Sequence, residues 1–159
     1  MTGPVARNLI RTMFVNKGNA DKLSVRPADV PKSKVTKLGV LGAGMMGAGV
    51  AYVSAMAGME VILIDSTTEQ AEKGKAYSAK LLAKDVEKGR RTQEQAEAVL
   101  ARIKPTIDYA QLEGADLVIE AVFEHRSIKA DVTAKAEAVM PKTSVFASNT
   151  STLPITGLA

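Results

Sequence analysis

The chain has 159 residues, of which 46% are hydrophobic and 24% charged, the composition of one ordinary globular domain with a sizeable core. It has no cysteine, which excludes a disulfide scaffold and thiolate metal sites and fits a reducing compartment, so we expect a cytoplasmic location. Residues 1–37 carry eight Lys or Arg against two Asp or Glu, whereas residues 38–159 carry thirteen against fifteen; with aromatics at only 4%, this argues against nucleic-acid binding.

The N-terminal part predicts a short amphipathic helix over residues 7–17, ended by Gly18. Its apolar face is formed by Leu9, Ile10, Met13 and Phe14. Pro27 and Pro31 forbid a continuing helix, so an extended connector should follow. We therefore assign residues 1–36 to a linker helix and connector, in which the helix docks against another domain.

The remainder, residues 37–159, alternates between apolar segments and helical patterns. Strands are expected at 37–43, 60–65, 115–123 and 144–148, with a weak one near 106–109. Helices are expected at 45–57, from about 66 to 88, from 92 to before Pro105, and from about 128 to Pro141. The second and third begin with the spacing of a capping box, as in Thr92 and Gln95, and the last is marked by Ile128, Val132, Ala136 and Val139 at helical spacing. Strands that are apolar throughout indicate a parallel sheet covered on both faces. The predicted fold is a doubly wound α/β domain of the Rossmann type, with a helical insertion after the second strand. The longest apolar runs are rich in Gly and Ala and end in a charged strand, so we expect no membrane span.

A glycine turn, Gly42-Ala43-Gly44-Met45-Met46-Gly47, lies between the first strand and the first helix. In this context Gly42 permits a tight turn, Gly44 leaves room for a pyrophosphate, and Gly47 lets the helix approach the sheet. Asp65 ends the next strand, where an acid accepts hydrogen bonds from a ribose. No Arg follows to hold a 2′-phosphate, so we predict NAD rather than NADP. Alternatively, the glycines serve only turn and packing, and Asp65 caps the next helix.

The segments LGVLGAGMMGAGVAY, EVILID, DLVIEAVFE and FASNTSTLPIT, taken together, resemble the NAD-binding domain of L-3-hydroxyacyl-CoA dehydrogenases. The similarity extends to multifunctional β-oxidation proteins that fuse an enoyl-CoA hydratase to that dehydrogenase. It implies oxidation of L-3-hydroxyacyl-CoA to 3-ketoacyl-CoA with NAD. The leader, residues 1–36, resembles the end of the hydratase half through its stretch RNLIRTMFVNKGNADKL.

The resemblance also implies roles for individual residues. The implied cofactor-binding residues are Gly42, Gly44, Met46, Gly47, Asp65, Val122, Phe123, Glu124, Lys129 and Ser151. Ser151 would approach both the nicotinamide and the substrate's 3-hydroxyl, with Asn149 beside it. From the residues alone, Glu124 reads as a solvated loop acid and Lys129 as a helix-surface lysine. Glu120, inside an apolar strand, reads as structural, because a buried carboxylate is costly unless it is hydrogen-bonded.

In the family a histidine base, held by a glutamate, follows the Ser151 loop, and the given sequence stops before such a motif. The single histidine, His125, is expected at the surface. We therefore expect this chain to be a part of the enzyme that is catalytically inactive by itself. Its expected partners are the acyl-CoA substrate, a preceding hydratase domain, a following helical domain and further copies of itself in a homo-oligomer. The alternatives are the NAD-binding domain of another hydroxy-acid dehydrogenase and a non-enzymatic NAD-sensing module.

Overall fold

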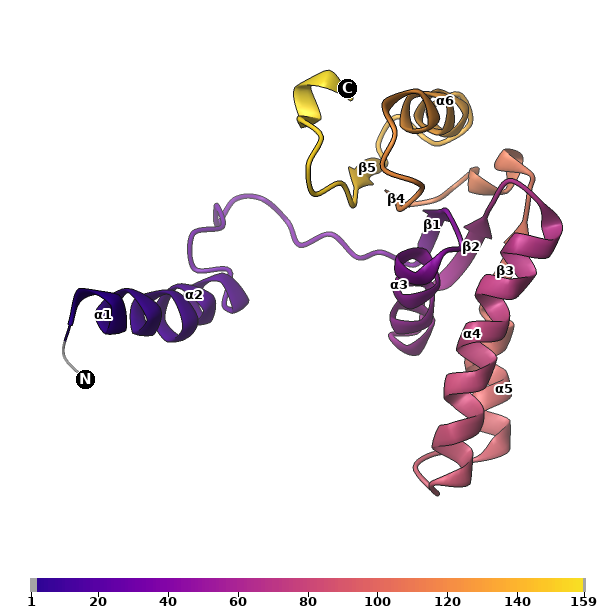
Figure 1. Cartoon of the computed structure of the whole chain (residues 1–159), viewed down its shortest axis with the longest axis horizontal. Coiled ribbons are helices and arrows are strands. Elements are labelled where there is room, and N and C mark those ends of the chain that lie inside the picture. Colours follow the sequence, from indigo (N-terminus) through magenta and orange to yellow (C-terminus); the bar gives the residue numbers. More distant parts are fainter. Residues whose placement is uncertain (1–2, 159) are drawn as a thin grey trace. The chain divides into compact units, whose positions relative to one another are not determined.

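The computed structural model describes residues 3–158 of the chain and divides into two units, Met1–Ser33 and Lys34–Ala159 (Figure 1). The first unit is one continuous helical segment: α1 (Pro4–Ile10), a wider π-type stretch (Arg11–Asn16) and α2 (Lys17–Asp21). The predicted helix is confirmed, but its predicted end at Gly18 is wrong. An ion pair of 2.6 Å between Lys17 and Asp21 spans the glycine, and such a pair offsets part of the cost of glycine in a helix. The helix ends at Asp21 with Lys22 as its C-cap, before Leu23 takes a left-handed φ of 51°.

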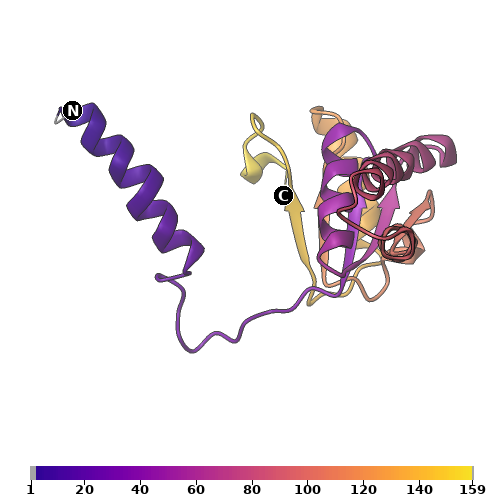
Figure 2. The same cartoon turned by 90° about the horizontal axis from the view of Figure 1, so that it is seen from below.

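The second unit is built on one parallel sheet, which confirms the doubly wound fold. Its strands are β1 (Lys37–Leu41), β2 (Glu60–Ile64), β3 (Ile103–Thr106), β4 (Leu117–Glu120) and β5 (Val145–Ser148). They lie in the order β3-β2-β1-β4-β5, and every neighbouring pair is parallel. Figure 2 shows β5, in yellow, at one edge of this sheet. The chain order reverses between β1 and β4, which makes their carboxyl ends the topological switch point, where open α/β sheets bind ligands.

Helices cover both faces of the sheet. On one face lie α3 (Met45–Met56), α4 (Thr68–Glu87) and α5 (Gln93–Ala101), and on the other lies α6 (Arg126–Glu137) (Figure 1). The buried side chains form two clusters that match these layers. Leu38, Val40 and Leu63 pack toward the face of α3, α4 and α5. Leu41 and Ile64 pack toward α6. Because strand side chains alternate between faces, a strand buried on both sides is apolar throughout.

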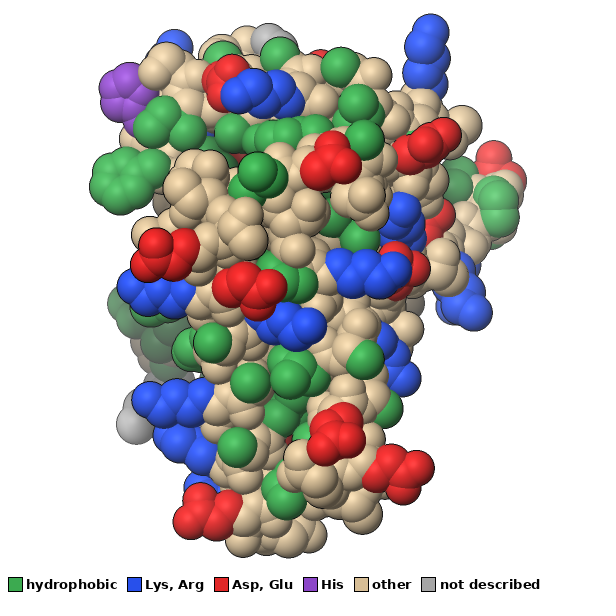
Figure 3. Space-filling model, turned by 90° about the vertical axis from the view of Figure 1, so that its right-hand side faces the viewer, with side chains coloured by type: hydrophobic (Ala, Val, Ile, Leu, Met, Phe, Trp, Pro, Cys, Tyr) green, Lys and Arg blue, Asp and Glu red, His purple; other side chains and the backbone are tan. Residues whose placement is uncertain are grey.

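Two helices, α4 and α5, lie between β2 and β3 in the chain. The Thr67 hydroxyl accepts a hydrogen bond from the Gln70 amide at 3.2 Å and so caps α4. Thr92 and Gln95 form a complete capping box at the start of α5, as their spacing predicted. On the side of the molecule where these helices lie, acidic and basic side chains are interspersed (Figure 3). Within residues 3–158, no helix has the length and apolar character that crossing a membrane requires.

The weak strand expected at 106–109 is misplaced. The strand is β3, and it begins at Ile103, which sequence periodicity had assigned to the preceding helix. Ile103 is fully buried on the α3, α4 and α5 side. Pro105 is accommodated because β3 is an edge strand, and only edge strands tolerate a residue without an N–H. Similarly, β4 ends at Glu120, so Val122 and Phe123 lie in the loop that follows rather than in the strand.

Candidate functional site

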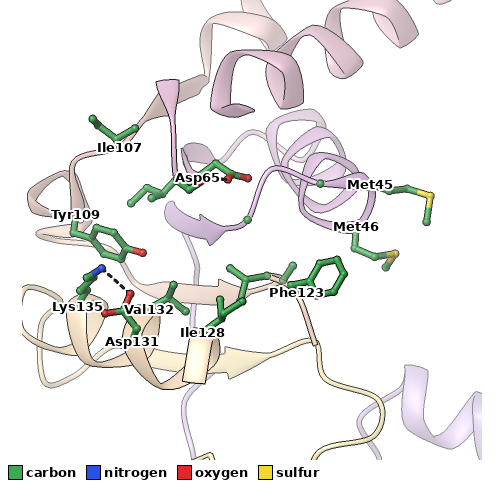
Figure 4. Close-up of a pocket in the computed structure, with 16 residues that line it drawn as sticks. Met45, Met46, Asp65, Ile107, Tyr109, Phe123, Ile128, Asp131, Val132 and Lys135 are labelled. Carbon is green, nitrogen blue, oxygen red and sulfur yellow. Dashed lines mark hydrogen bonds and ion pairs between the residues drawn. The ribbon is translucent and has the colours of Figure 1, made fainter. Parts of the chain in front are cut away.

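A cleft of about 800 Å³ lies at the carboxyl ends of β1, β2 and β4, at the switch point of the sheet (Figure 4). The predicted site residues that line it are Gly42, Gly44, Met46, Asp65, Val122 and Phe123. They come from three separate segments: the glycine turn, the end of β2 and the loop after β4. The fold therefore brings these predicted residues, up to 81 positions apart from Gly42 to Phe123, around one concave surface.

The three glycines of the turn have different structural surroundings. Gly42 has a φ of 94°, and a Cβ there would lie 2.6 Å from the carbonyl oxygen of Ala121. At Gly47 a Cβ would lie 1.7 Å from the Gly42 carbonyl oxygen. Both positions therefore require glycine for the fold itself. Gly44 differs, because a Cβ there would meet nothing within 4 Å. Open space at this glycine, which begins α3 without a side-chain cap, fits an anion at a helix N-terminus.

Asp65 lies at the end of β2 with its carboxylate turned toward the glycine turn (Figure 4). One carboxylate oxygen accepts a hydrogen bond from the Ala43 amide at 2.6 Å, and the other accepts from the Ser66 amide at 2.6 Å. Thr67, not Asp65, caps α4, so the interpretation of Asp65 as a helix cap is wrong. These bonds fix the acid at the rim of the cleft, and a carboxylate oxygen has further lone pairs for hydroxyl donors.

Part of the cleft was missed by sequence reasoning. It is lined also by Ile107, Tyr109, Ile128, Asp131, Val132 and Lys135. Lys135 binds Asp131 at 2.6 Å, and Tyr109 lies beside this pair (Figure 4). The bond to Asp131 raises the pKa of Lys135, and burial raises the pKa of Tyr109. Ile128 and Val132 had been recognised only as the inner face of α6, and a helix pattern does not show which end of that face meets a cleft.

Next to the cleft, buried Glu120 and Lys129 form an ion pair with side chains exposed by only 1% and 2%. The Lys129 ammonium donates to both Glu120 oxygens, at 2.8 and 2.9 Å, and contacts Glu124 Oε2 at 3.1 Å. Burial lowers the pKa of Lys129, but its bonds to Glu120 and Glu124 outweigh this and raise it overall. Lys129 is thus not the surface lysine that its sequence context suggested. Glu120 has the structural role expected of a buried carboxylate.

Glu124 fastens the loop that follows β5. Its Oε1 accepts hydrogen bonds from the Thr150 hydroxyl, from the Ser151 amide at 3.2 Å, and from the Thr152 amide and hydroxyl at 3.3 and 3.1 Å. The Thr150 hydroxyl, with smaller contributions from Lys129 and Thr152, lowers the pKa of Glu124 to about 2. The carboxylate is therefore charged throughout the physiological pH range.

Several predicted site residues do not line the cleft. Gly47 is buried beneath the glycine turn, and Lys129 is buried in the ion pair with Glu120. Glu124, Asn149 and Ser151 are exposed beside it, with the Asn149 amide donating to the Glu120 carbonyl at 2.8 Å. His125 is exposed, and its Nδ1 lies 2.9 Å from the Ser127 hydroxyl. Within residues 3–158, no group of three His, Cys, Asp or Glu is placed to hold a metal ion.

Comparison with known families gives a match over residues 37–159 to the model of the NAD-binding domain of 3-hydroxyacyl-CoA dehydrogenase. Solved structures agree. An (S)-3-hydroxybutyryl-CoA dehydrogenase from Ralstonia eutropha is 33% identical with a TM-score of 0.74, over 79% of this chain and 44% of the other. A 3-hydroxybutyryl-CoA dehydrogenase from Escherichia coli is 35% identical with a TM-score of 0.75, over 79% of this chain and 27% of the other.

A further similar structure is the dehydrogenase part of multifunctional enzyme 1 from C. elegans. It is 26% identical with a TM-score of 0.67, over 79% of this chain and 29% of the other. The chain thus spans less than half of the length of each of these solved relatives.

Proposed function

Since this chain belongs to the family of 3-hydroxyacyl-CoA dehydrogenase NAD-binding domains, we propose that it supplies the cofactor-binding part of an enzyme that oxidises L-3-hydroxyacyl-CoA to 3-ketoacyl-CoA in fatty acid β-oxidation. The observation that carries the proposal is the open cleft at the switch point, with unobstructed space at Gly44 and a fixed carboxylate at Asp65.

The residues present fit NAD. The amides at the start of α3 and the space at Gly44 suit the pyrophosphate, and the Asp65 carboxylate suits the ribose hydroxyls of the adenosine half. Met46, Val122 and Phe123 offer apolar surface in the same cleft. The 2′-phosphate that NADP carries on this ribose is negatively charged and would be repelled by Asp65. We propose Glu124, Lys129, Asn149 and Ser151 as further contacts, on the strength of the family resemblance.

Bound NAD supplies the hydride acceptor of the reaction. The chain's residues bind and orient it: the glycine turn fixes the phosphates, and the loop after β4 forms one wall of the nicotinamide side. Ser151, held by its amide to Glu124, presents a hydroxyl for the 3-hydroxyl of the substrate. Removal of the substrate proton requires a base. In the part of the chain that the structure describes, the one histidine is bonded to Ser127 rather than placed in the cleft.

We propose that the preceding hydratase domain, the following helical domain and the acyl-CoA substrate complete the active enzyme, in a cytoplasmic protein that forms homo-oligomers. Similarity to the dehydrogenase part of a multifunctional enzyme supports this arrangement. Accordingly, this chain should bind NAD without turning over substrate. NADH formation from L-3-hydroxybutyryl-CoA by the purified chain, measured at 340 nm, would contradict the expected inactivity.

The binding proposal is tested with Gly44→Ala, because a Cβ at this position clashes with nothing in the protein. If the cleft holds a pyrophosphate, the variant should stay folded, lose no more than about 1 kcal/mol because alanine is a poorer N-cap than glycine, and bind NAD about tenfold or more weakly by calorimetry. The matched control is Gly49→Ala in α3, where a Cβ also meets nothing within 4 Å. Equal NAD affinity in both variants would show that the glycines serve only the fold.

A substrate test separates the acyl-CoA enzyme from another hydroxy-acid dehydrogenase and from a sensing module. A longer protein that contains this chain should oxidise L-3-hydroxyacyl-CoA, and acyl-CoA should compete. Activity on free hydroxy acids without such competition would favour another dehydrogenase. NAD binding without any dehydrogenase activity would favour the sensor.

A further inference from the structure

The loop after β5 is held mainly by hydrogen bonds that its amides and hydroxyls donate to side-chain oxygen atoms. Three consecutive residues, Thr150, Ser151 and Thr152, donate to the single oxygen Oε1 of Glu124. The Thr150 hydroxyl also accepts from the Leu153 amide at 3.2 Å, closing the turn. Because the Glu124 carboxylate holds two successive amides and two hydroxyls, its position determines where the Ser151 side chain lies.

Glu124 is itself held by buried charge. Its second oxygen contacts the Lys129 ammonium, whose other two contacts go to Glu120. An ammonium has three N–H donors, so these three contacts use its full capacity. Lys129 is 2% exposed. Lys129 therefore acts on the loop after β5 through the carboxylate of Glu124.

Glu120 extends the same network to the cleft wall and to β5. Its Oε1 accepts from the Val122 amide at 2.8 Å, and its Oε2 accepts from the Ser148 hydroxyl at 2.7 Å. The Thr150 amide donates in turn to that hydroxyl at 3.2 Å. Val122 lines the cleft. The three charged residues thus link the stretch from the end of β4 to α6, which includes Val122, to the end of β5 and the loop that follows it.

We propose that Glu120, Lys129 and Glu124 form a positioning network that fixes the position of Ser151 relative to Val122, which lines the cleft. The inference rests on the proposed function and deepens it: Glu124 and Lys129 act on the reaction by fixing Ser151, in addition to the cofactor contacts that the family resemblance implies. A buried ion pair is costly to desolvate and is retained where its hydrogen bonds are complete. The network meets this condition, since both Glu120 oxygens and the Lys129 ammonium are each bonded at least twice.

The network can be tested by NMR on the chain as it stands, with Glu124→Ala and Glu124→Gln. The Glu124 side chain is 39% exposed, so its loss should leave the fold intact. In Glu124→Ala the Ser151 and Thr152 amides should exchange with solvent about tenfold faster, because each loses a bond to a charged acceptor. Glu124→Gln keeps an oxygen acceptor and should restore part of this protection. Lys104→Met, which removes an exposed lysine paired with Glu60 on the far edge of the sheet, is the control and should change neither amide.

A cofactor titration separates positioning from a purely local role. In the unmodified chain, NAD should shift both the Gly44 and the Ser151 amide resonances. In Glu124→Ala it should still shift Gly44, whereas the shift of Ser151 should be lost. Ser151 and Thr152 exchange rates that stay unchanged in Glu124→Ala, or a Ser151 shift that persists there, would overturn the positioning network. An unmodified chain in which NAD leaves Gly44 unshifted would instead overturn the proposed function, and loop exchange would still report on the anchoring.

Lys129→Met provides a second measurement. It leaves the buried Glu120 carboxylate without its counter-charge, which should lower stability markedly. The double variant Glu120→Gln and Lys129→Met removes both charges and should recover part of the stability, while the Ser151 and Thr152 amides still exchange faster than in the unmodified chain. Protection at the unmodified level in this folded double variant would show that Glu124 alone fixes the loop, which overturns the role of Lys129.

Discussion

At the scale of single residues, the glycine turn shows how one short motif serves two purposes. Gly42 and Gly47 are required because neighbouring backbone atoms leave no room for a side chain, whereas Gly44 faces open space. A sequence pattern alone does not separate these reasons. The structure shows that the fold requires two of the glycines and that the third faces open space, where we propose that the cofactor binds.

This division predicts opposite stability effects for two glycines of α3. Gly47→Ala places a Cβ 1.7 Å from the Gly42 carbonyl oxygen, so the helix must move away from the strand. The expected loss is ~3 kcal/mol or more, in the range of severe overpacking. Gly49→Ala should instead stabilise by up to about 1 kcal/mol, because alanine favours a helix interior. Urea unfolding of both variants measures the difference, and equal midpoints would contradict it.

The anchoring of the Ser151 loop should depend on pH in a defined direction. The hydrogen bond from the Thr150 hydroxyl, with smaller contributions from Lys129 and Thr152, lowers the pKa of Glu124 from its ordinary value of 4.5 to about 2. A lowered pKa means that the charged form stabilises the folded state. This contribution is fully present above pH 4.5 and is lost as the pH falls toward 2.

Amide exchange of Ser151 and Thr152, compared with exchange of amides in β1 and corrected for intrinsic rates, measures this directly. Protection of the loop should stay constant from pH 7 down to about 4.5 and fall at lower pH, before the core opens. In Glu124→Gln the same profile should lack this step. A step near pH 6 would point to a histidine and contradict the assignment.

The buried network of Glu120, Lys129 and Glu124 shows a limit of sequence analysis, because residue types and spacing point to only two of its three members. Glu120 inside an apolar strand calls for a partner, and Lys129 lies three and seven residues before Val132 and Ala136 on the buried face of α6. From the sequence Lys129 was nevertheless interpreted as a surface lysine, and the structure shows that it pairs with Glu120. The third partner, Glu124, was beyond reach because its loop position depends on how the chain turns after β4.

At the scale of elements, local chemistry defined most boundaries. The spacing from Thr92 to Gln95 correctly predicted the start of α5, and apolar runs correctly located β1, β2, β4 and β5. The failures have tertiary causes. β3 is short and contains Pro105, so only its pairing with β2 at the sheet edge makes it a strand. The helix that continues through Gly18 likewise gave no local signal.

The caps predict how much each helix of the insertion depends on its threonine. At α5 both bonds of the capping box are present, at 3.1 and 3.2 Å. At α4 only the bond from the Gln70 amide to Thr67 is formed. Thr92→Ala should therefore cost about 1 to 2 kcal/mol, and Thr67→Ala about 1 kcal/mol or less. Chemical denaturation of each variant tests the order, and a larger loss for Thr67→Ala would contradict it.

At the scale of the whole molecule, the leader and the α/β unit form two distinct units. Among residues 3–158, the members of the two buried clusters and the side chains packed against them begin at Val35, and α1 and α2 contain no buried residue. Several large apolar side chains of the leader are exposed, among them Leu9 at 59% and Phe14 at 75%. An exposed apolar helix face tends to bind another surface. The sequence predicted such a face, although its natural partner stays a proposal.

Removing residues 1–33 tests this separation. The shortened chain keeps Val35 and Thr36, and the Thr36 amide donates to Asp116 at 2.7 Å to fasten the start of β1. Its melting temperature and NAD affinity should therefore equal those of the full chain. Self-association should decrease, because the exposed helix face is gone. Thermal unfolding and sedimentation velocity at matched concentrations measure both effects.

A melting temperature lower by more than about 4 °C, equivalent to roughly 1 kcal/mol, would show that the leader stabilises the α/β unit. Unchanged self-association would show that the associating surface lies on the α/β unit instead. The exposed Phe123 at the cleft would then be the first residue to replace.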